Sequence, residues 1–292
     1  MKTITLEAPA KVNLALDILR KRPDGYHDMD MVMQTVSLTD TVSVTETGEG
    51  FSLLAEGITL PPGKKSLEQQ AAEAFFQKLG RPMPGLTVHL TKRIPAYAGM
   101  GGGSADVAAV LRGLRTLYAP ELPLTVLEEI GFTVGSDMPF CVRGGTCRAR
   151  GRGELLTNLT PLPECWFVIC KPDFDIPTPT LFARVRPDAL ENRPDLSGMQ
   201  RALGTGDLVG VAERLSNVFE SVLPPEDREV FSIKTRLIEL EALNAAMSGS
   251  GPTVFGIFSQ EKPARMAAEN LRNTHRQVFL ANPTSWERLE KN

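Results

Sequence analysis

The fold of this chain is organised around the stretch Lys92-Arg93-Ile94-Pro95-Ala96-Tyr97-Ala98-Gly99-Met100-Gly101-Gly102-Gly103-Ser104-Ala105-Asp106, which has four glycines in five positions. Ordered glycine costs roughly 0.5–1 kcal/mol relative to alanine, so such a run usually marks close approach of the backbone to a ligand. Apolar residues then recur at helical spacing: Val107, Val110, Leu111, Leu114 and Leu117. We expect Ser104 to cap this helix. The glycines therefore lead into a helix N-terminus, whose free N–H groups and dipole bind anions such as phosphate.

Two other phosphate-binding loops fit this stretch poorly. A Walker A loop ends in Gly-Lys-Ser or Gly-Lys-Thr, whereas Ser104 directly follows Gly103. A dinucleotide fingerprint needs a strand that runs straight into the first glycine and an acid about 20 residues later. Here Pro95 interrupts the approach from the strand expected at 86–90, and Glu121 lies in a Pro-rich turn. A mobile surface loop is the remaining alternative, and the helix directly behind the glycines argues against it.

Length and composition are those of an ordinary soluble protein. The 292 residues are enough for two domains with substantial cores. The formal net charge of −3 argues against nucleic acid as a partner, because binding to phosphate backbones needs clustered Lys and Arg. No apolar run reaches the length of a membrane span, and the N-terminus lacks a signal-peptide core. We therefore expect a cytoplasmic protein without a membrane partner, either a monomer or a homodimer.

The cysteines do not predict a metal site. Cys141, Cys147, Cys165 and Cys170 contain no Cys-x-x-Cys pair, and the chain has only three histidines. We interpret the four cysteines as reduced and mostly buried thiols.

A β-hairpin is predicted near the N-terminus. Val12, Leu14, Leu16 and Ile18 alternate as in a strand, which places Lys11 and Asn13 together on its other face. After a turn at 22–27, Met29, Met31, Met33 and Thr35 alternate again, as expected for the second strand of a hairpin. We expect strands at 42–44 and 51–54 to extend an antiparallel sheet.

The remaining elements predict an α/β sandwich in the second half of the chain. We expect helices from Ser66, a capping-box residue, to Gly80, from Thr125 to Gly131, and at 207–223, 229–243 and 263–273. We expect strands at 86–90, 166–170, 253–258 and 277–280, and turns at 134–140, 176–179 and 247–252. The segment 154–163 is the expected seam, so we place an N-terminal domain at 1–157 and a C-terminal domain at 158–292.

Three separated motifs resemble one enzyme superfamily. Pro9-Ala10-Lys11-Val12-Asn13-Leu14, the loop from Gly99 to Ser104 and the loop Ser248-Gly249-Ser250-Gly251 are similar to the three motifs of the GHMP small-molecule kinases, in their usual order. Within that superfamily, Arg22-Pro23-Asp24-Gly25-Tyr26-His27, Gly135-Ser136-Asp137-Met138-Pro139-Phe140 and Ile176-Pro177-Thr178-Pro179 resemble the branch that acts on a cytidine-diphosphate sugar alcohol.

The resemblance implies a fold and a reaction. The fold would be α+β, with an N-terminal domain like that of ribosomal protein S5, a ferredoxin-like α/β sandwich as the C-terminal domain, and the active site between them. The reaction would be ATP-dependent phosphorylation of the 2-hydroxyl of 4-(cytidine 5′-diphospho)-2-C-methyl-D-erythritol, in the non-mevalonate route to isoprenoid precursors. Two alternatives are another GHMP kinase acting on a mevalonate-like or homoserine-like alcohol, and a non-catalytic nucleotide-binding sensor.

The resemblance also implies roles for individual residues. Asp137 would be the general base, although Gly-Ser-Asp before a proline is by itself more typical of a turn or helix cap. Lys11 would stabilise this carboxylate and the charge on the transferred phosphoryl group, where a half-exposed strand lysine is ordinarily solvated. The substrate-binding residues would be Asn13, Tyr26, His27 and Phe182.

The ATP phosphates would lie on the glycine loop. Its expected ATP-binding residues are Pro95, Ala96, Tyr97, Ala98, Gly99, Met100, Gly101, Gly102, Gly103, Ser104 and Ala105. Mg²⁺ would bridge the phosphates, with the Ser104 hydroxyl as a candidate ligand. Tyr97 replaces an expected glycine, and Ser66 lies in a departure from the family's usual entry to the helix beside adenine. The third motif, Ser248, Gly249, Ser250 and Gly251, would close on the site from the second domain.

Overall fold

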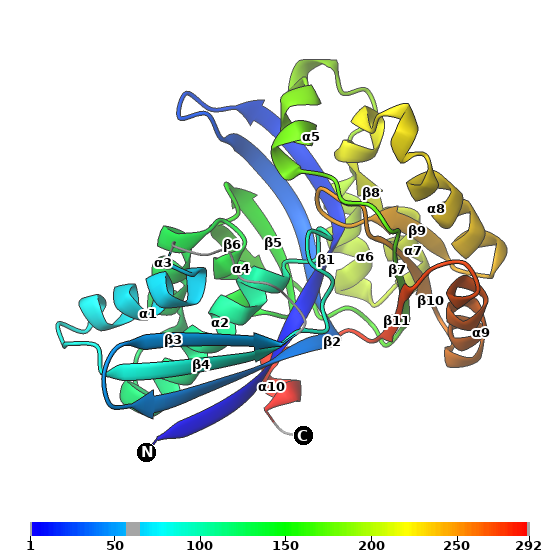
Figure 1. Ribbon diagram of the computed structural model, residues 1–292. Coiled ribbons are helices and arrows are strands. Elements are labelled where there is room, and N and C mark those ends of the chain that lie inside the picture. Colours follow the sequence, from blue (N-terminus) through cyan, green and yellow to red (C-terminus); the bar gives the residue numbers. More distant parts are fainter. Residues whose placement is uncertain (1, 57–64, 291–292) are drawn as a thin grey trace.

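The computed structural model describes residues 2–56 and 65–290, and it places two β-sheets with their helices side by side (Figure 1). Within these residues, seven strands form the first sheet in the order β3-β4-β2-β1-β8, with β5 paired to β2 and β6 to β5. Their bounds are β1 Thr3–Lys21, β2 His27–Thr47, β3 Phe51–Glu56, β4 Gly85–Thr91, β5 Thr146–Gly151, β6 Leu155–Asn158 and β8 Ser216–Asn217. The second sheet has the order β11-β7-β10-β9, from β7 Trp166–Lys171, β9 Asn244–Met247, β10 Val254–Phe258 and β11 Gln277–Ala281.

The predicted hairpin is confirmed, and its strands are longer than the alternation indicated. Lys21 pairs with His27 across the turn, and β2 continues without a break to Thr47. A register shift near Pro9 and Ala10 leaves Ser37 and Leu38 without partners in β1, so the alternation is interrupted there although the strand is not. The expectation that 51–54 extends an antiparallel sheet is wrong, because β3 pairs in parallel with β4, which lies between β2 and β3.

The helices of the described residues cover both sheets. Their bounds are α1 Leu67–Lys78, α2 Gly102–Tyr118, α3 Leu124–Val134, α4 Met138–Arg143, α5 Thr178–Arg184, α6 Leu196–Thr205, α7 Leu208–Glu213, α8 Glu229–Glu239, α9 Glu261–Arg272 and α10 Trp286–Leu289. Ser66 caps α1 through the N–H of Gln69, as the sequence predicted. The helix expected to start at Thr125 instead begins at Leu124, after Pro123, and extends beyond Gly131 to Val134.

Two predicted turns are the starts of short helices. The turns expected at 134–140 and 176–179 lead directly into α4 and α5, and each of these helices has a proline in its first two positions, Pro139 and Pro179. Proline is tolerated there because the first N–H groups of a helix have no acceptor within it. In a short segment, proline therefore marks a helix start as readily as a turn.

The helix predicted at 207–223 is wrong beyond Glu213. The chain leaves α7 there, forms β8 beside β1, and continues as a 3₁₀ turn at residues 218–222. The cause is tertiary, because the side chain of Asn217 binds the backbone of the loop after β9. Apolar spacing cannot reveal such a contact.

The second sheet confirms the ferredoxin-like expectation. Its strands follow one another along the chain as β7, β9, β10 and β11, and helices intervene between the first two and the last two. This is the β-α-β-β-α-β arrangement, with all pairs antiparallel. The fold is thus a mixed α+β structure of two sheets.

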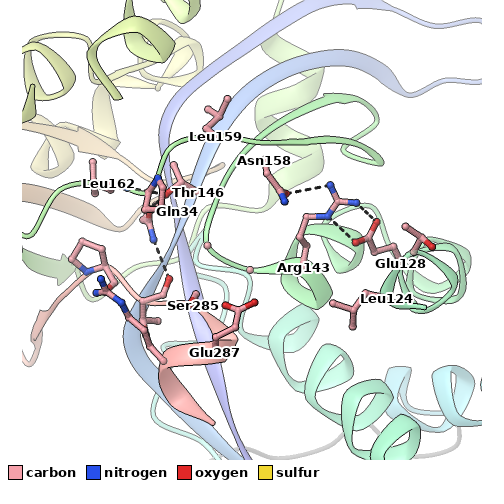
Figure 2. A pocket seen from close by; sticks show the side chains of 17 residues that line it. Gln34, Leu124, Glu128, Arg143, Thr146, Asn158, Leu159, Leu162, Ser285 and Glu287 are labelled. Atoms are coloured by element: carbon pink, nitrogen blue, oxygen red, sulfur yellow. Dashed lines mark hydrogen bonds and ion pairs between the residues drawn. The ribbon is translucent and has the colours of Figure 1, made fainter. Parts of the chain in front are cut away.

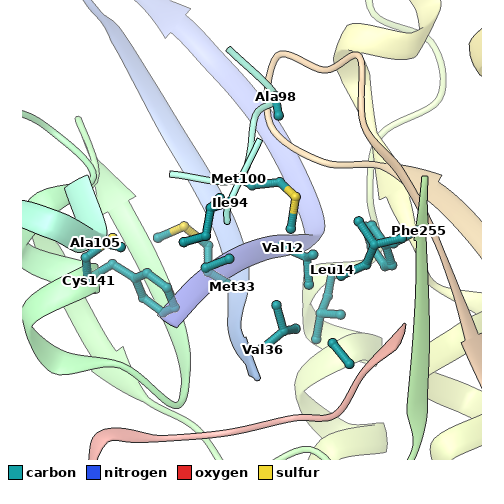
Figure 3. Packing of buried hydrophobic residues seen from close by; sticks show 14 of the residues in the cluster. Val12, Leu14, Met33, Val36, Ile94, Ala98, Met100, Ala105, Cys141 and Phe255 are labelled. Carbon is teal, nitrogen blue, oxygen red and sulfur yellow. The ribbon is translucent and has the colours of Figure 1, made fainter. Parts of the chain in front are cut away.

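A continuous core joins the two sheets. Figure 3 shows Val12 and Leu14 of β1 beside Met100 of the glycine loop and Phe255 of β10, all within one buried cluster. The chain also crosses between the sheets more than once, because β8 of the first sheet lies between β7 and β9 of the second in sequence. In addition, Val36 of β2 bridges to Pro283 after β11. The proposed boundary at 157/158 therefore stays a prediction. Among the described helices, none is both long and apolar enough to span a bilayer.

Candidate active site

A cavity of about 1140 Å³ opens between the two sheets, where the three quoted motifs meet. Strand β1 contributes Lys11 and Asn13, and the turn before α4 contributes Asp137. Phe182 of α5 and Gly249 after β9 line it from the other side. Residues far apart in the sequence thus face a single cleft.

Lys11 and Asp137 form the central charged pair of this cavity. The Lys11 Nζ lies 3.7 Å from Asp137 Oδ2 and donates a 2.6 Å hydrogen bond to Asn13 Oδ1. The side chain of Lys11 is 4% exposed, whereas that of Asp137 is 38% exposed. Asp137 occupies the N-cap position of α4, but its side chain makes no capping hydrogen bond. Its carboxylate is therefore available to the cavity beside a fixed cation.

The glycine loop forms the N-terminus of α2, and this corrects the predicted cap. Gly101, with φ +68°, is the N-cap, while Ser104 lies in the first turn. Glycine reaches this left-handed conformation without strain, and it leaves the helix end uncovered by a side chain. The first four N–H groups of a helix have no acceptor within it, and here they belong to residues 101–104. The loop thus presents unpaired donors to the cavity.

Glycine is required at position 99 by close approach of the third motif. A Cβ atom there would lie 2.1 Å from the carbonyl oxygen of Ser248. The Ser248 hydroxyl donates to the Gly99 carbonyl at 3.0 Å and accepts the N–H of Asn13 at 3.4 Å. The third motif therefore packs directly on the glycine loop. Gly249 and Ser250 line the cavity, while Ser248 is fully buried behind them.

The residues of the glycine loop divide between cavity and core. Those that line the cavity are Pro95, Ala96, Tyr97, Ala98, Gly99, Gly101, Gly102, Gly103 and Ser104. Met100 and Ala105 are buried in the core, and Figure 3 shows both side chains there. Tyr97 takes φ +50°, in the left-handed region, and its side chain is 79% exposed. The tyrosine thus adopts a backbone conformation that glycine would favour.

The β1–β2 hairpin extends upward beside α5 (Figure 1). The His27 ring stacks on Phe182 with centroids 5.0 Å apart, and Phe182 meets the edge of Phe219 at 4.9 Å. Phe182 and Phe219 line the cavity, and His27 adjoins it through its contact with Phe182. Tyr26 points elsewhere, because the Arg152 guanidinium covers its ring at 3.6 Å. The structure therefore groups His27 with Phe182 but not with Tyr26.

Comparison with known proteins shows which family shares this architecture. Residues 66–145 match the GHMP kinases N terminal domain, and residues 199–277 match the GHMP kinases C terminal family. A 4-diphosphocytidyl-2-C-methyl-D-erythritol kinase of Exiguobacterium sibiricum is 42% identical over 279 residues, which cover 95% of this chain and 97% of that protein. The chain belongs to this kinase family.

Solved structures agree with that assignment. A crystal structure of 4-(cytidine 5′-diphospho)-2C-methyl-D-erythritol kinase matches with a TM-score of 0.80 and 34% identity, covering 96% of this chain and 98% of that one. Homoserine kinase from Cytophaga hutchinsonii matches with a TM-score of 0.74 over 98% of this chain and 96% of its own, at 19% identity. The second likeness shows a shared fold alone.

Beside the glycine loop lies a buried charge cluster of Asp40, Lys92 and Asp106, which was not predicted from the sequence. The Lys92 Nζ contacts Asp40 and lies 2.5 Å from Asp106 on α2. Burial raises the pKa of Asp106 to about 7, Lys92 opposes this rise and the Asp40 carboxylate adds to it. Lys92 and Asp106 both line the cavity, and Asp106 Oδ1 has no hydrogen-bond partner. The available signal was that both residues bracket the glycine stretch.

A second cavity, of about 520 Å³, lies at the far end of α4 (Figure 2). Two of the charged residues that line it are already paired with each other, since Arg143 donates two hydrogen bonds to Glu128, at 2.7 and 2.5 Å. The Gln34 amide binds the carbonyls of Thr35 and Thr284. We therefore place the candidate active site in the larger cavity, where Lys11 meets a carboxylate that remains partly open.

Proposed function

We propose that the protein phosphorylates the 2-hydroxyl of 4-(cytidine 5′-diphospho)-2-C-methyl-D-erythritol with ATP. The observation that carries this proposal is the Lys11–Asp137 pair, which faces the open N-terminus of α2 across one cavity. The names of its close relatives supply the identity of the alcohol. Phosphoryl transfer depends mainly on positioning and on matched charge, and such a cavity can provide both.

The glycine loop would bind the ATP phosphates. Its unpaired N–H groups at residues 101–104 and the positive end of the α2 dipole favour a negatively charged group at this place. The Lys11 side chain lies against the same loop, since a Cβ on Gly101 would be 3.1 Å from Lys11 Cγ and 3.4 Å from Cε. The terminal phosphate would therefore meet both backbone donors and a buried cation.

Asp137 would accept the proton of the attacking hydroxyl. The hydroxyl oxygen forms a bond to the γ-phosphorus, the bond from that phosphorus to the β–γ bridging oxygen breaks, and ADP leaves. Asp137 takes the released proton or orients the hydroxyl, and the Lys11 ammonium balances the charge that builds up on the phosphoryl oxygens. Asn13 holds the Lys11 ammonium from the side, so the cation stays directed at the reacting groups.

The aromatic residues of the hairpin and α5 would bind the cytidine. Phe182 lines the cavity wall, and stacking on an aromatic ring suits any nucleobase. His27, which stacks on Phe182, would offer its ring nitrogens to the base edge. Tyr26 would reach the base only if it left Arg152, so we assign it a weaker role than His27.

Mg²⁺ fits the residues beneath the glycine loop. The described residues contain no cluster of three or more potential metal-binding His, Cys, Asp or Glu, and Mg²⁺ at kinase sites is held by one or two protein oxygens together with the phosphates. Ser104 and the unpartnered Oδ1 of Asp106 line this part of the cavity. The ion would neutralise phosphate charge there.

The test is ADP release with MgATP and three alcohols: the cytidine-diphosphate methylerythritol, mevalonate and homoserine. We expect turnover with the first alone. Asp137→Asn should lower kcat by about 10²–10⁴. The matched control is Asp175→Asn, which removes another cavity carboxylate, paired with Lys171 at 2.9 Å, and should keep most activity.

The alternatives give different results in the same assay. Turnover of mevalonate or homoserine would keep the kinase chemistry and reject the cytidine-binding role of His27 and Phe182. A protein that binds ATP but releases no ADP with any alcohol would be a sensor. Equal losses in Asp137→Asn and Asp175→Asn would reject Asp137 as the base.

A further inference from the structure

The loop of the third motif is held by a buried amide outside the three motifs. Asn217 ends β8, which pairs with β1 in parallel, and only 5% of the residue is exposed. Its Nδ2 donates to the carbonyl of Met247 at 2.8 Å and to that of Gly249 at 2.7 Å. The two N–H donors of the amide thus fix both ends of a tight turn, and neither donor is left over.

This turn borders the phosphate side of the cavity. A Cβ on Gly249 would lie 2.8 Å from the Gly99 carbonyl and 3.1 Å from Lys11 Nζ. With so little free space, a shift of the turn toward these atoms would displace the glycine loop or Lys11, and a shift away would remove its packing against them. The position of the turn therefore sets how Lys11 and the loop face each other.

The oxygen of the same amide controls the alcohol side of the cavity. Asn217 Oδ1 accepts the N–H of Phe219 at 3.0 Å and so starts the 3₁₀ turn at 218–222. Phe219 meets Phe182 edge to face at 4.9 Å and an interplanar angle of 85°, and Phe182 carries His27. The placement of the aromatic wall thus depends on this acceptor.

We infer that Asn217 is a positioning residue that joins the two halves of the active site, its donors fixing the ATP side and its acceptor fixing the alcohol side. This inference rests on the proposed function for the identity of the two substrates. Asn217 itself does not line the cavity and would touch neither substrate.

Two substitutions test the donor side and the acceptor side of the Asn217 amide separately. Asn217→Asp keeps the acceptor for Phe219 and replaces the donors by an oxygen that repels the two carbonyls. We expect kcat to fall about tenfold or more and the KM for ATP to rise, because small misplacements near reacting groups are costly, while the KM for the alcohol changes little. Phe219→Leu keeps the donors and removes the aromatic edge. It should raise the KM for the alcohol about 2- to 12-fold and leave that for ATP unchanged.

A matched control distinguishes positioning from stability. Asn244 of β9 bonds in the same way, donating to the Ala212 carbonyl at 2.8 Å and accepting the N–H of Ala245, but neither of these partners lines the cavity, whereas Gly249 and Phe219 do. Asn244→Asp should lower the melting temperature without changing either KM. If Asn217→Asp shows wild-type kinetics, or behaves like Asn244→Asp, the inference is wrong.

Two further measurements keep the test decisive. If Asn217→Asp does not fold, the neutral Asn217→Ala replaces it. That variant loses donors and acceptor together and should raise both KM values; unchanged values would overturn the inference. Calorimetric binding of a non-hydrolysable ATP analogue to wild-type and variant protein needs no alcohol. Weaker binding by the variant supports the role of Asn217, whether or not the wild-type protein turns over the cytidine substrate. A failure of the wild-type protein to turn over that substrate would reject the proposed function and not the role of Asn217.

Discussion

Lys11 and Asp137 differ in how tightly the fold holds them. Lys11 is buried, and its backbone N–H donates to the Met100 carbonyl while its ammonium donates to Asn13. Asp137 is partly exposed at the mouth of the cavity. A fixed cation and an accessible carboxylate are what phosphoryl transfer to an alcohol requires.

The Lys11 ammonium should be needed for turnover rather than for folding. We expect Lys11→Met to lower kcat by about 10²–10³, the loss typical of removing one charge-stabilising donor in a closed site. Steady-state kinetics at saturating ATP and alcohol measure this loss. Lys65→Met removes an exposed lysine paired with Glu73 and should change kcat by less than about twofold. Comparable losses in both variants would contradict a catalytic role for Lys11.

His27 should give the alcohol KM a pH dependence. Burial lowers the pKa of His27 below its ordinary 6.5, and the Lys21 charge lowers it further. Neutral imidazole offers one donor and one acceptor to a base edge. The KM should therefore stay flat from about pH 8 to 6.5 and rise only below the lowered pKa. His27→Gln should abolish that rise, and an identical rise in this variant would reject the assignment.

The same shift fixes the sign of a stability effect. Between the lowered pKa and 6.5, the unfolded chain binds a proton at His27 that the folded chain does not. The free energy of unfolding therefore decreases as the pH falls through this range.

At the scale of elements, the sequence predicts what local pattern controls. The hairpin, the helix behind the glycines and the Ser66 cap follow from alternation, helical spacing and a capping box. The start of α2 was misplaced because Ser104 fits a cap by residue type, whereas the structure uses Gly101 to leave the helix end open. The end of α7 was not predicted because it depends on the hydrogen bond from Asn217 to a backbone carbonyl 30 residues away.

The candidate site shows the same division. Lys11, Asn13 and the glycines of the loop could be proposed from the sequence because their motifs are contiguous, and all of them line the cavity. The cluster of Asp40, Lys92 and Asp106 was missed because it joins β2, the end of β4 and α2, and only the fold brings them together.

That cluster should anchor the glycine loop to the sheet. The Asp40 carboxylate also accepts the N–H of Ile94 at 2.8 Å, where the loop begins. Lys92→Met would leave two buried carboxylates without their cation, and we expect it to lower the free energy of unfolding by about 3–5 kcal/mol. Urea denaturation measures the loss. Adding Asp106→Asn should restore part of it by removing one of the charges, and no recovery in the double variant would contradict this account.

At the scale of the whole molecule, the two sheets share one core and exchange chain segments. After β11, the chain returns to the first sheet, where Trp286 is buried and its indole N–H donates to the Cys141 carbonyl of α4 at 2.8 Å. Strand β8 lies between β7 and β9 of the second sheet in sequence, but it pairs with β1 of the first sheet. Neither sheet is therefore a separate folding unit in its contacts.

The two tryptophans test this interdependence, because Trp166 lies in β7 of the second sheet and Trp286 packs on the first. Trp286→Phe removes the hydrogen bond to Cys141 and should cost about 1 kcal/mol. In that variant Trp166 is the only fluorescent tryptophan, and its unfolding midpoint in urea should fall together with that of the far-UV circular dichroism. The loss then spreads to a sheet that the substitution does not touch, as a single cooperative transition requires. Trp166→Phe supplies the reciprocal measurement, with Trp286 as the probe. If the Trp166 fluorescence instead keeps its wild-type urea midpoint while the midpoint from circular dichroism falls, the two sheets unfold independently. The shared core would then not be the reason why the active site keeps its shape.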